Sequence, residues 1–300
     1  MAIKTVQAII NGQSYTLALN SATGKYEATI TAPGKTSYNQ SGGYYNVQVK
    51  ATNDAGTVGS ADASTLGGLK LYVKEKVAPV ITILSPSSGA YVSNSKQPVV
   101  FTVTDETDGS GVDLSTLVVK LDGTTVASAT ITSTAITNGY SVTYTPASAL
   151  ADGSHTVTVD CKDHDGNAAA KKSTTYTVDT VPPTLNITSP TEGYITNKAA
   201  LTVAGTTNDA TSSPVTVKIK LNGADQGGVT VGSGGAFTKS ITLAEGANTI
   251  VITATDAAGK VSTVTRNVTL DTSVPVIKSA TITPNPVDAG ATMVIAVEIE

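Results

Sequence analysis

The amino-acid sequence predicts an all-β protein, and three observations support this fold class. Only 14% of the 300 residues are charged, and the chain has 2 Phe and no Trp. Small and β-branched residues dominate instead, which suits half-buried strands better than helices. Short runs alternate apolar and polar residues, and Pro, Gly and Asn recur between them at turn positions. At about 100 to 150 residues per domain, the length allows two or three domains.

A motif of a strand followed by a turn occurs three times. In each copy apolar or small residues alternate, Asn or Asp follows, and Gly stands three positions further on: Val47–Gly56, Val157–Gly166 and Ile250–Gly259. Alternation places the apolar residues on one face of a strand, and the Asn or Asp with Gly ends it. The copies lie about 100 residues apart, the size of an immunoglobulin-like sandwich. The sequence therefore predicts tandem immunoglobulin-like β-sandwiches.

Further repeated segments mark the limits of the domains. Pro-containing joints follow the motif at 77–79, 179–183 and 271–275, because proline cannot continue a ladder. An opening strand with a Pro turn follows each joint, starting at Ile81, Asn186 and Ser279. A strand closed by an Asn-Gly or Asp-Gly turn precedes each motif, at 8–12, 119–123 and 219–223.

The order of these segments predicts two whole domains and one divided domain. Residues 78–179 and 180–271 contain all of them, so each is expected to be a complete Ig-like domain. Residues 1–77 are expected to be an incomplete Ig-like domain that lacks its first two strands. Residues 272–300 supply only the opening hairpin. One domain is therefore expected to be split between the N- and C-termini.

The segments TDGSGVDLSTLVVKLDG (107–123) and VDCKDHDGN (159–167), with the DT-x-P type of joint, resemble bacterial Ig-like domain repeats. Such repeats occur in phage virion proteins and Gram-positive surface adhesins. The resemblance implies a non-enzymatic structural or interaction protein of a phage virion or bacterial surface assembly. The first twenty residues lack the apolar run of about 7 to 15 residues of a signal peptide. We therefore expect synthesis in the cytoplasm without a Sec signal, and a virion or extracellular location after lysis.

The divided domain suggests a mode of self-association. An incomplete sandwich leaves apolar residues and strand edges uncovered, a configuration that invites strand addition. We expect the C-terminal hairpin of one subunit to complete the N-terminal domain of the next, because two intervening domains separate the ends of one chain. Such a head-to-tail contact builds a ring or a filament. The expected interface residues are Ile9, Val47, Ile282, Met293, Ile295 and Val297.

Two other arrangements fit the same sequence. Residues 1–77 are a self-sufficient small β domain in the first, and the C-terminal hairpin then docks on its own third domain. In the second, the hairpin docks on a different protein. Other virion proteins and host cell-surface glycan are the further candidate partners.

Acidic residues in a Gly-rich loop form a candidate calcium site. Asp105, Asp108 and Asp113 lie there with Glu106 nearby, and calcium prefers hard oxygen ligands. The alternative is a solvated turn whose Asp side chains accept hydrogen bonds from backbone amides. The corresponding loop of the next domain retains only Asp209. Calcium is the only cofactor that the sequence suggests.

A tyrosine cluster supports an alternative function. Tyr38, Tyr44 and Tyr45 lie in one segment, and aromatic faces can stack on sugar rings. Tyrosine near a strand end more often covers a sandwich core. The alternative function is a monomeric Ig-like adhesion module that binds cell-surface glycan.

Several classes of protein are disfavoured. The net charge is -4 and Arg266 is the single Arg, which argues against nucleic acid as a partner. No run of about 18 apolar residues suggests a membrane span. Cys161 occupies the position of Ala51 and Ala254, so we interpret it as a small core residue. Neither histidine lies near a catalytic Ser and carboxylate, and no P-loop or dinucleotide motif occurs, so an enzyme is not expected.

Overall fold

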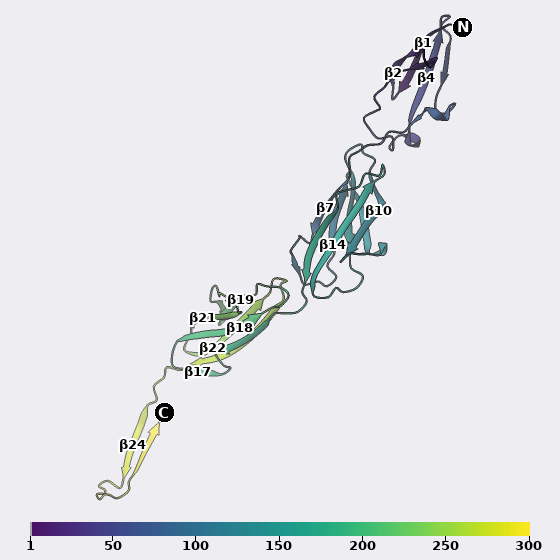
Figure 1. Cartoon of the computed structure of the whole chain (residues 1–300). Helices are drawn as coiled ribbons and strands as arrows, with labels where there is room; N and C mark the ends of the chain where they lie inside the picture. The colour runs from purple at the N-terminus through teal and green to yellow at the C-terminus, as the bar shows by residue number, and fades with distance from the viewer. Residues whose placement is uncertain (1) are drawn as a thin grey trace. The chain divides into compact units, whose positions relative to one another are not determined.

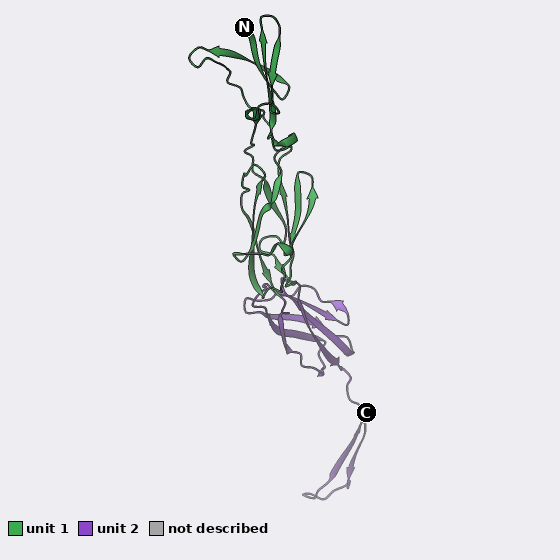
Figure 2. Cartoon of the chain, turned by 90° about the vertical axis from the view of Figure 1, so that its right-hand side faces the viewer, with its two compact units in different colours: residues 1–179 green, residues 180–300 purple. Residues whose placement is uncertain are grey.

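The computed structural model describes residues 2–300 and confirms the all-β prediction. The chain divides between Asp179 and Thr180 into two compact units (Figure 2). The first contains an N-terminal sheet and a complete sandwich, and the second contains another sandwich and a C-terminal hairpin. Each unit is described by itself. Within residues 2–300 no helix has the length and hydropathy needed to cross a membrane.

The sandwich of the first unit has two facing sheets. One has the strand order β12-β13-β9-β7 and the other β11-β10-β14-β15-β8. The short 3-10 helix η3 (Ser128–Thr130) precedes β12. The strands are β7 (Val80–Ser85), β8 (Tyr91–Val92), β9 (Val99–Thr104), β10 (Val112–Leu121), β11 (Thr124–Thr125), β12 (Ile131–Ile136), β13 (Gly139–Tyr144), β14 (Gly153–Asp163) and β15 (Lys172–Val178).

Alternation in the sequence explains the core of this sandwich. Phe101 and Val103 of β9 point inward from one sheet, and Val157 and Val159 of the repeated motif point inward from the other, all fully buried. Cys161, the next inward residue of the motif, is also buried, as its equivalence to alanine indicates. Burial raises the pKa of its thiol, which keeps it protonated and unreactive.

The sandwich of the second unit repeats this plan. Its sheets have the orders β16-β18-β21 and β17-β23-β22-β19-β20, and Ile250, Ile252 and Ala254 of the motif are fully buried between them. The strands are β16 (Thr184–Ser189), β17 (Tyr194–Thr196), β18 (Ala200–Asn208), β19 (Thr216–Leu221), β20 (Ala224–Asp225), β21 (Ala236–Thr242), β22 (Gly246–Thr255) and β23 (Val261–Leu270).

The N-terminal residues form one layer rather than two. Their sheet has the order β3-β2-β1-β4-β5, with β6 also paired to β4 (Figure 1). The buried hydrophobic residues in 2–77 are Val6, Ala8, Tyr45 and Ala63, and no core cluster like those of the two sandwiches includes them. The elements are β1 (Ile3–Ile10), β2 (Gln13–Asn20), β3 (Lys25–Glu27), η1 (Ser41–Gly43), β4 (Tyr45–Asn53), β5 (Val58–Ala61), η2 (Gly67–Leu69) and β6 (Lys70–Leu71).

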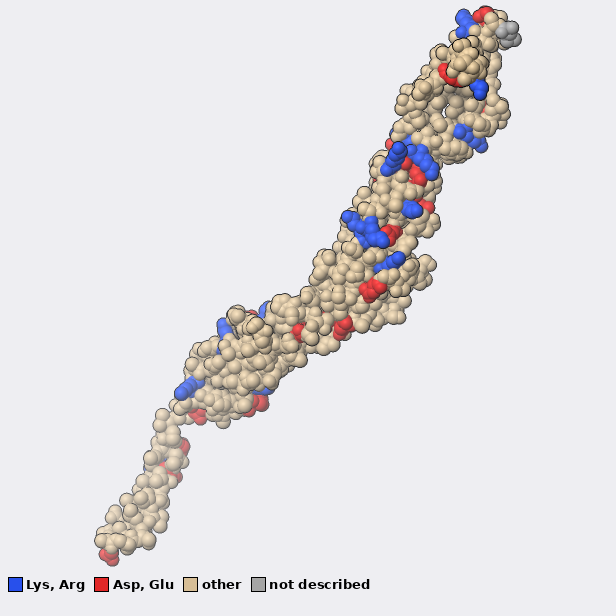
Figure 3. All heavy atoms as spheres, viewed as in Figure 1, with Lys and Arg blue, Asp and Glu red and all other residues tan. Residues whose placement is uncertain are grey.

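The C-terminal residues form a two-stranded antiparallel hairpin of β24 (Ile277–Thr283) and β25 (Val294–Ile299). Every residue of both strands is exposed. Where the hairpin lies in Figure 1, the space-filling view in Figure 3 shows a surface of mostly uncharged residues.

The three Asn-Gly or Asp-Gly segments are two-residue hairpin turns. Both turn residues have positive φ in each case, which favours Asn or Asp followed by Gly. The turns are Asn11-Gly12, Asp122-Gly123 and Asn222-Gly223, and they join β1 to β2, β10 to β11 and β19 to β20.

Candidate functional site

The N-terminal sheet has one face that is largely apolar. Pairing of β1 with β4 places Val6 opposite Ala51, Ala8 opposite Val49 and Ile10 opposite Val47. Opposite residues in a sheet share a face, so these side chains form one surface, to which β2 adds Tyr15 and Leu17. We call Val6, Ala8, Ile10, Tyr15, Leu17, Val47, Val49 and Ala51 the N-terminal apolar face.

The same positions are fully covered in the complete domains. Val47, Val49 and Ala51 correspond in the repeated motif to Ile250, Ile252 and Ala254. The second set is completely buried, whereas the first is half-buried. The difference is the second sheet, which β16, β18 and β21 supply in the complete domain.

Ile9, which the sequence placed in this surface, lies on the other face of the sheet. It pairs with Gln48 and Ser14, and its equivalent in the complete domain is the exposed Lys220. Ile10 takes its place beside Val47, because neighbouring residues of a strand point to opposite faces. The prediction for Ile9 was therefore wrong by one residue.

The C-terminal hairpin has a matching apolar face. Cross-strand pairing places Ile282 opposite Ile295 and Ala280 opposite Val297, with Ile299 next along β25. We call Ile282, Ala280, Ile295, Val297 and Ile299 the hairpin apolar face. The large residues among them are 45 to 61% exposed. Met293 directly precedes β25 and is also exposed.

This hairpin is paired like the opening hairpin of the first sandwich. Thr283 pairs with Val294, as Ser85 pairs with Val100, and each hydroxyl residue is followed by Pro. One residue further along, Ile295 therefore corresponds to Phe101. Val297 then corresponds to Val103.

Burial differs sharply between the corresponding residues. Phe101 and Val103 are 0% exposed, whereas Ile295 and Val297 are 60% and 49% exposed. The hairpin thus presents core residues that no second sheet covers within the described residues.

An open groove lies beside the N-terminal apolar face. It has a volume of about 650 Å³ and lies between Ile10, Tyr15 and Tyr45 of the sheet and the segment 31–35. Segment 31–35 precedes the repeated motif of the N-terminal domain. In the complete domains the strand that precedes the motif, β13 or β21, belongs to the sheet that faces the motif. The groove is therefore on the side where a second sheet packs in those domains.

Three carboxylates meet at the joint between the N-terminal sheet and the first sandwich. One oxygen from each of Glu75, Asp105 and Glu106 lies within 4.8 Å of one from each of the others. Asp105 is only 8% exposed. One buried oxygen of each residue, Glu75 Oε2, Asp105 Oδ1 and Glu106 Oε2, has no hydrogen-bond partner. Uncompensated buried carboxylate oxygens are costly, so the cluster has the chemistry of a hard-cation site.

The other carboxylate oxygens fix the geometry of this cluster. The Ser110 amide donates to Glu75 Oε1 at 2.7 Å, and the Gly111 amide donates to Asp105 Oδ2 at 2.7 Å. A Cβ on Gly109 would lie 2.7 Å from Asp105 Oδ2, so the loop closes around the carboxylates only with glycine there.

The proximity of the acids shifts their titration. Burial, together with the neighbouring Glu75 and Asp105, raises the pKa of Glu106 to about 8. Burial also opposes ionisation of Glu75, but hydrogen bonds from Glu106 and Ser110 outweigh it and lower the pKa of Glu75. A shared proton between like charges is the expected state of such a pair without a cation.

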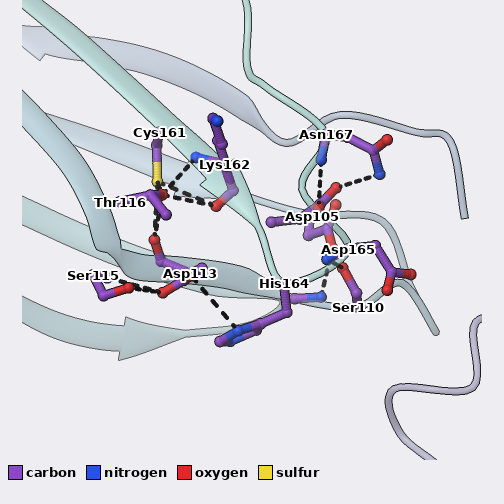
Figure 4. A network of polar contacts seen from close by, with 12 residues as sticks. Asp105, Ser110, Asp113, Ser115, Thr116, Cys161, Lys162, His164, Asp165 and Asn167 are labelled. Carbon is purple, nitrogen blue, oxygen red and sulfur yellow. Dashed lines mark hydrogen bonds and ion pairs between the residues drawn. The ribbon is translucent and has the colours of Figure 1, made fainter. Parts of the chain in front are cut away.

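Only Asp105 of the three predicted calcium ligands belongs to this cluster. Asp108 forms an ion pair with Lys35, and Asp113 accepts hydrogen bonds from the Ser115 amide and hydroxyl (Figure 4). The Ser115 hydrogen bonds lower the pKa of Asp113, which acts as a turn cap. Asp209 of the next domain likewise accepts from the Thr211 and Ser212 amides.

Glu75 was missed in the sequence although a signal was present. It stands four residues before Pro79 and four residues after Leu71, where the last strand of its domain, β6, ends. Asp271 stands in the same relation to Pro275 at the later joint. An acid four residues before a joint proline is therefore the sequence signal that could have identified Glu75.

The three tyrosines of the predicted glycan site do not share a surface. Tyr45 is buried, and its hydroxyl donates to the Lys35 carbonyl. Tyr38 stacks on His164 of the first sandwich. Tyr44 packs edge-on against Tyr72 at 6.2 Å, with Lys70 over its ring. The aromatic pair in contact with each other is therefore the half-buried Tyr44 and the exposed Tyr72.

Comparisons with known proteins agree with the fold. Residues 87–180 match the bacterial Ig-like domain family, and residues 183–272 match domain B of glucodextranase. No curated protein matches the chain.

Several solved structures are similar at low identity. The fibronectin(III)-like modules of Clostridium thermocellum CbhA are 16% identical, with a TM-score of 0.41 over 64% of this chain and 94% of theirs. A bacterial ice-binding adhesin is 22% identical, with a TM-score of 0.32 over 90% and 88%. A titin segment, A168–A170, is 14% identical, with a TM-score of 0.41 over 88% and 85%.

The sheet orders, the buried repeat positions and the two family matches lead to one assignment. The chain carries bacterial Ig-like repeats, with a bacterial Ig-like domain over residues 87–180 and a domain like domain B of glucodextranase over residues 183–272.

Proposed function

We propose that this protein is a non-enzymatic structural protein that associates with copies of itself. The hairpin apolar face of one copy covers the N-terminal apolar face of the next. This contact joins two different surfaces, so repeated copies extend into a filament or close into a ring. A phage virion or a bacterial surface assembly is the setting we propose for it.

One observation carries this proposal: two sets of core positions are uncovered in the same chain. Ile295 and Val297 are exposed where Phe101 and Val103 are buried. Val47 and Val49 are half-buried where Ile250 and Ile252 are fully buried. Full burial of one such side chain contributes about 1.5 to 3 kcal/mol. Joining the two faces therefore removes a large apolar area from water.

The test is sedimentation of the intact chain over a range of concentrations. The wild-type mass is expected to rise above 30.2 kDa with concentration. The double variant Ile295→Lys and Val297→Lys is expected to stay at the mass of one chain, because it places two charges on the docking face. Both positions are exposed, so the variant should keep its fold.

Val294→Lys is the matched control. Val294 is as exposed as Ile295 but pairs with Thr283 on the opposite face of the hairpin. It is expected to associate like the wild type. A wild-type chain of constant single mass at every concentration would refute self-association, and loss of association in Val294→Lys would refute the assigned face.

We further propose that calcium binds the Glu75, Asp105 and Glu106 cluster and stiffens the joint. Glu75 belongs to the segment that follows the N-terminal sheet, and the other two follow β9 of the sandwich. A cation shared by these carboxylates supplies the missing partner for their three buried oxygens. A stiff joint suits a protein that transmits force or position along a chain of domains.

The alternative function is a monomeric adhesion module that binds cell-surface glycan. Tyr44 and Tyr72 support it, because Tyr72 is 65% exposed and the two rings contact one another. Glycan binding by the wild type that Tyr44→Ala and Tyr72→Ala abolish would favour this function. Binding that survives both substitutions would eliminate the Tyr44 and Tyr72 site, and a wild type that binds no glycan would eliminate the function.

A further inference from the structure

Strand β3 is an edge strand in the N-terminal sheet. It pairs with β2 on one side only and ends the strand order β3-β2-β1-β4-β5. The corresponding strand of the first sandwich, β13, pairs with β12 on one side and with β9 on the other. An edge with free amide and carbonyl groups is a template for adding a strand.

The pairing of β2 with β3 fixes this correspondence residue by residue. Asn20 pairs with Lys25 and Leu19 with Tyr26, across a short turn. The same closing hairpin in the sandwich pairs Ile136 with Gly139 and Ala135 with Tyr140. Lys25 thus corresponds to Gly139, and Tyr26 to Tyr140.

The correspondence continues beyond the end of β3. Ala28 and Ile30 take the places of Val142 and Tyr144, which are buried in strand β13. In the N-terminal domain, β3 ends at Glu27 and Ala28 is exposed. Residues 28–30 therefore occupy strand positions without a strand partner.

We propose that residues 25–30 are the acceptor strand for β25 of a second copy, with Ile295 opposite Ala28 and Val297 opposite Tyr26. The template is the antiparallel pairing of β9 with β13, where Phe101 is opposite Val142 and Val103 is opposite Tyr140. This inference rests on the proposed self-association and adds the strand and the register of the contact.

Charge selects this register over the nearest alternative. The second sandwich pairs Gly205 with Phe237, and its sequence FTKSIT aligns with YEATIT at 26–31. Gly205 pairs with Ile187 as Phe101 pairs with Ile83, so that template would place Ile295 opposite Tyr26 and Glu298 opposite Thr23. The register proposed here instead places Glu298 opposite Lys25. Opposite charges across a strand pair stabilise it.

The closing pair of the hairpin is common to both sandwiches. Thr283 with Val294 reproduces Ser85 with Val100 of the first sandwich and Ser189 with Ala204 of the second. This pairing fixes which residues of β25 correspond to core residues, and the charges at 25 and 298 then select the register on residues 25–30.

Disulfide trapping tests the register in the intact chain. The background is Cys161→Ala, which removes the native thiol and matches Ala254, a buried alanine at the same motif position. Ala28→Cys is combined with Ile295→Cys in one chain and with Val297→Cys in a second. All three positions are exposed, so both chains should fold. Oxidised products are separated by size under non-reducing conditions.

The pair at 28 and 295 is expected to produce a ladder of covalent oligomers. Directly opposite Cβ atoms lie about 4.5 to 5.5 Å apart, close to disulfide geometry. The pair at 28 and 297 is expected to lose this ladder, because diagonal Cβ atoms lie roughly 7 to 8 Å apart.

The outcomes separate this inference from the proposed function. A ladder for 28 and 297 instead of 28 and 295 would overturn the register, while self-association stands. No ladder for either pair in a chain that associates by sedimentation would overturn the acceptor strand alone. No ladder together with no association would overturn both.

Discussion

The ring of Tyr38 lies flat against the imidazole of His164, with 4.4 Å between ring centroids and 10° between planes. The contact links the N-terminal domain to the turn of the repeated motif in the first sandwich. Nearby, the Thr36 hydroxyl donates to Asp165 at 2.6 Å, and the Asn39 amide donates to the Gly109 carbonyl at 2.6 Å. Through this stack and these hydrogen bonds, residues 35–39 connect the N-terminal sheet to the sandwich loops that surround the carboxylate cluster.

Removal of this stack should loosen the joint. Aromatic stacking contributes about 0.5 to 1.5 kcal/mol, so Tyr38→Ala should raise the open fraction of the joint several-fold. Faster tryptic cleavage at Lys74 and Lys76 would report this opening. Tyr72→Ala, which removes an exposed ring outside the joint, should leave the cleavage rate unchanged. Equal rates for wild type and Tyr38→Ala would show that the stack does not hold the joint.

Equivalent valines should differ in their effect on stability. Val103→Ala removes fully buried methyl groups and should lower the free energy of unfolding of its sandwich by about 2 kcal/mol. Val297→Ala, at the corresponding place in the exposed hairpin, should leave unfolding of the dilute single chain unchanged. Urea denaturation at low concentration measures both. A comparable loss for Val297→Ala would mean that the hairpin packs on its own chain.

Calcium should raise the melting temperature of the first unit, and a chelator should reverse the shift. The ion binds the folded cluster and not the unfolded chain, so it stabilises by mass action. Glu75→Gln and Asp105→Asn should each remove the shift. Asp113→Asn should retain it, because Asp113 caps the Ser115 turn instead. Scanning calorimetry measures these melting temperatures. A melting temperature that neither calcium nor the chelator changes would contradict the site.

The ion pair of His155 with Asp122 should make stability depend on pH. His155 Nδ1 lies 2.8 Å from Asp122 Oδ2, and its Nε2 lies 2.9 Å from the Ala151 carbonyl. Burial disfavours the imidazolium, but these two hydrogen bonds outweigh it and raise the pKa of His155 above 6.5. The stabilisation is therefore fully present below about pH 6.5 and is lost as the pH rises through the raised value.

The matched variant for this pair is His155→Gln. Its deficit in unfolding free energy relative to wild type should be larger near pH 6 than near pH 9, as measured by urea denaturation. Asp122 affects stability at acidic pH. Its pKa is lowered, so its contribution to the free energy of unfolding is lost only as the pH falls through that lowered value. A deficit that is constant over this range would contradict the assigned pair.

Local patterns predicted the strands because the physical cause is local. Alternation identified Val157, Val159 and Cys161 as inward residues, and the Asn-Gly pairs located turns whose positive φ such residues tolerate. Ile9 and Ile10 are both apolar, so alternation within this segment did not show which of them shares a face with Val47, and the strand pairing assigns Ile10 to that face.

The carboxylate cluster was only partly predictable for a similar reason. Asp105, Asp108 and Asp113 are close in sequence, but the loop turns Asp108 toward Lys35 and Asp113 toward Ser115. The missing member, Glu75, comes from a different domain, about thirty residues earlier in the chain. Contacts between domains leave no periodic signal in either one, so proximity in the sequence was misleading here.

The most direct measurement mixes two variants that each lack one half of the proposed contact. Val297→Lys disables the hairpin apolar face, and Val47→Lys disables the N-terminal apolar face, where a half-buried lysine can still reach water with its ammonium group. By sedimentation, each variant alone should be a single chain, and an equimolar mixture should form pairs and nothing longer. Single chains in the mixture, or assembly of either variant alone, would contradict the account.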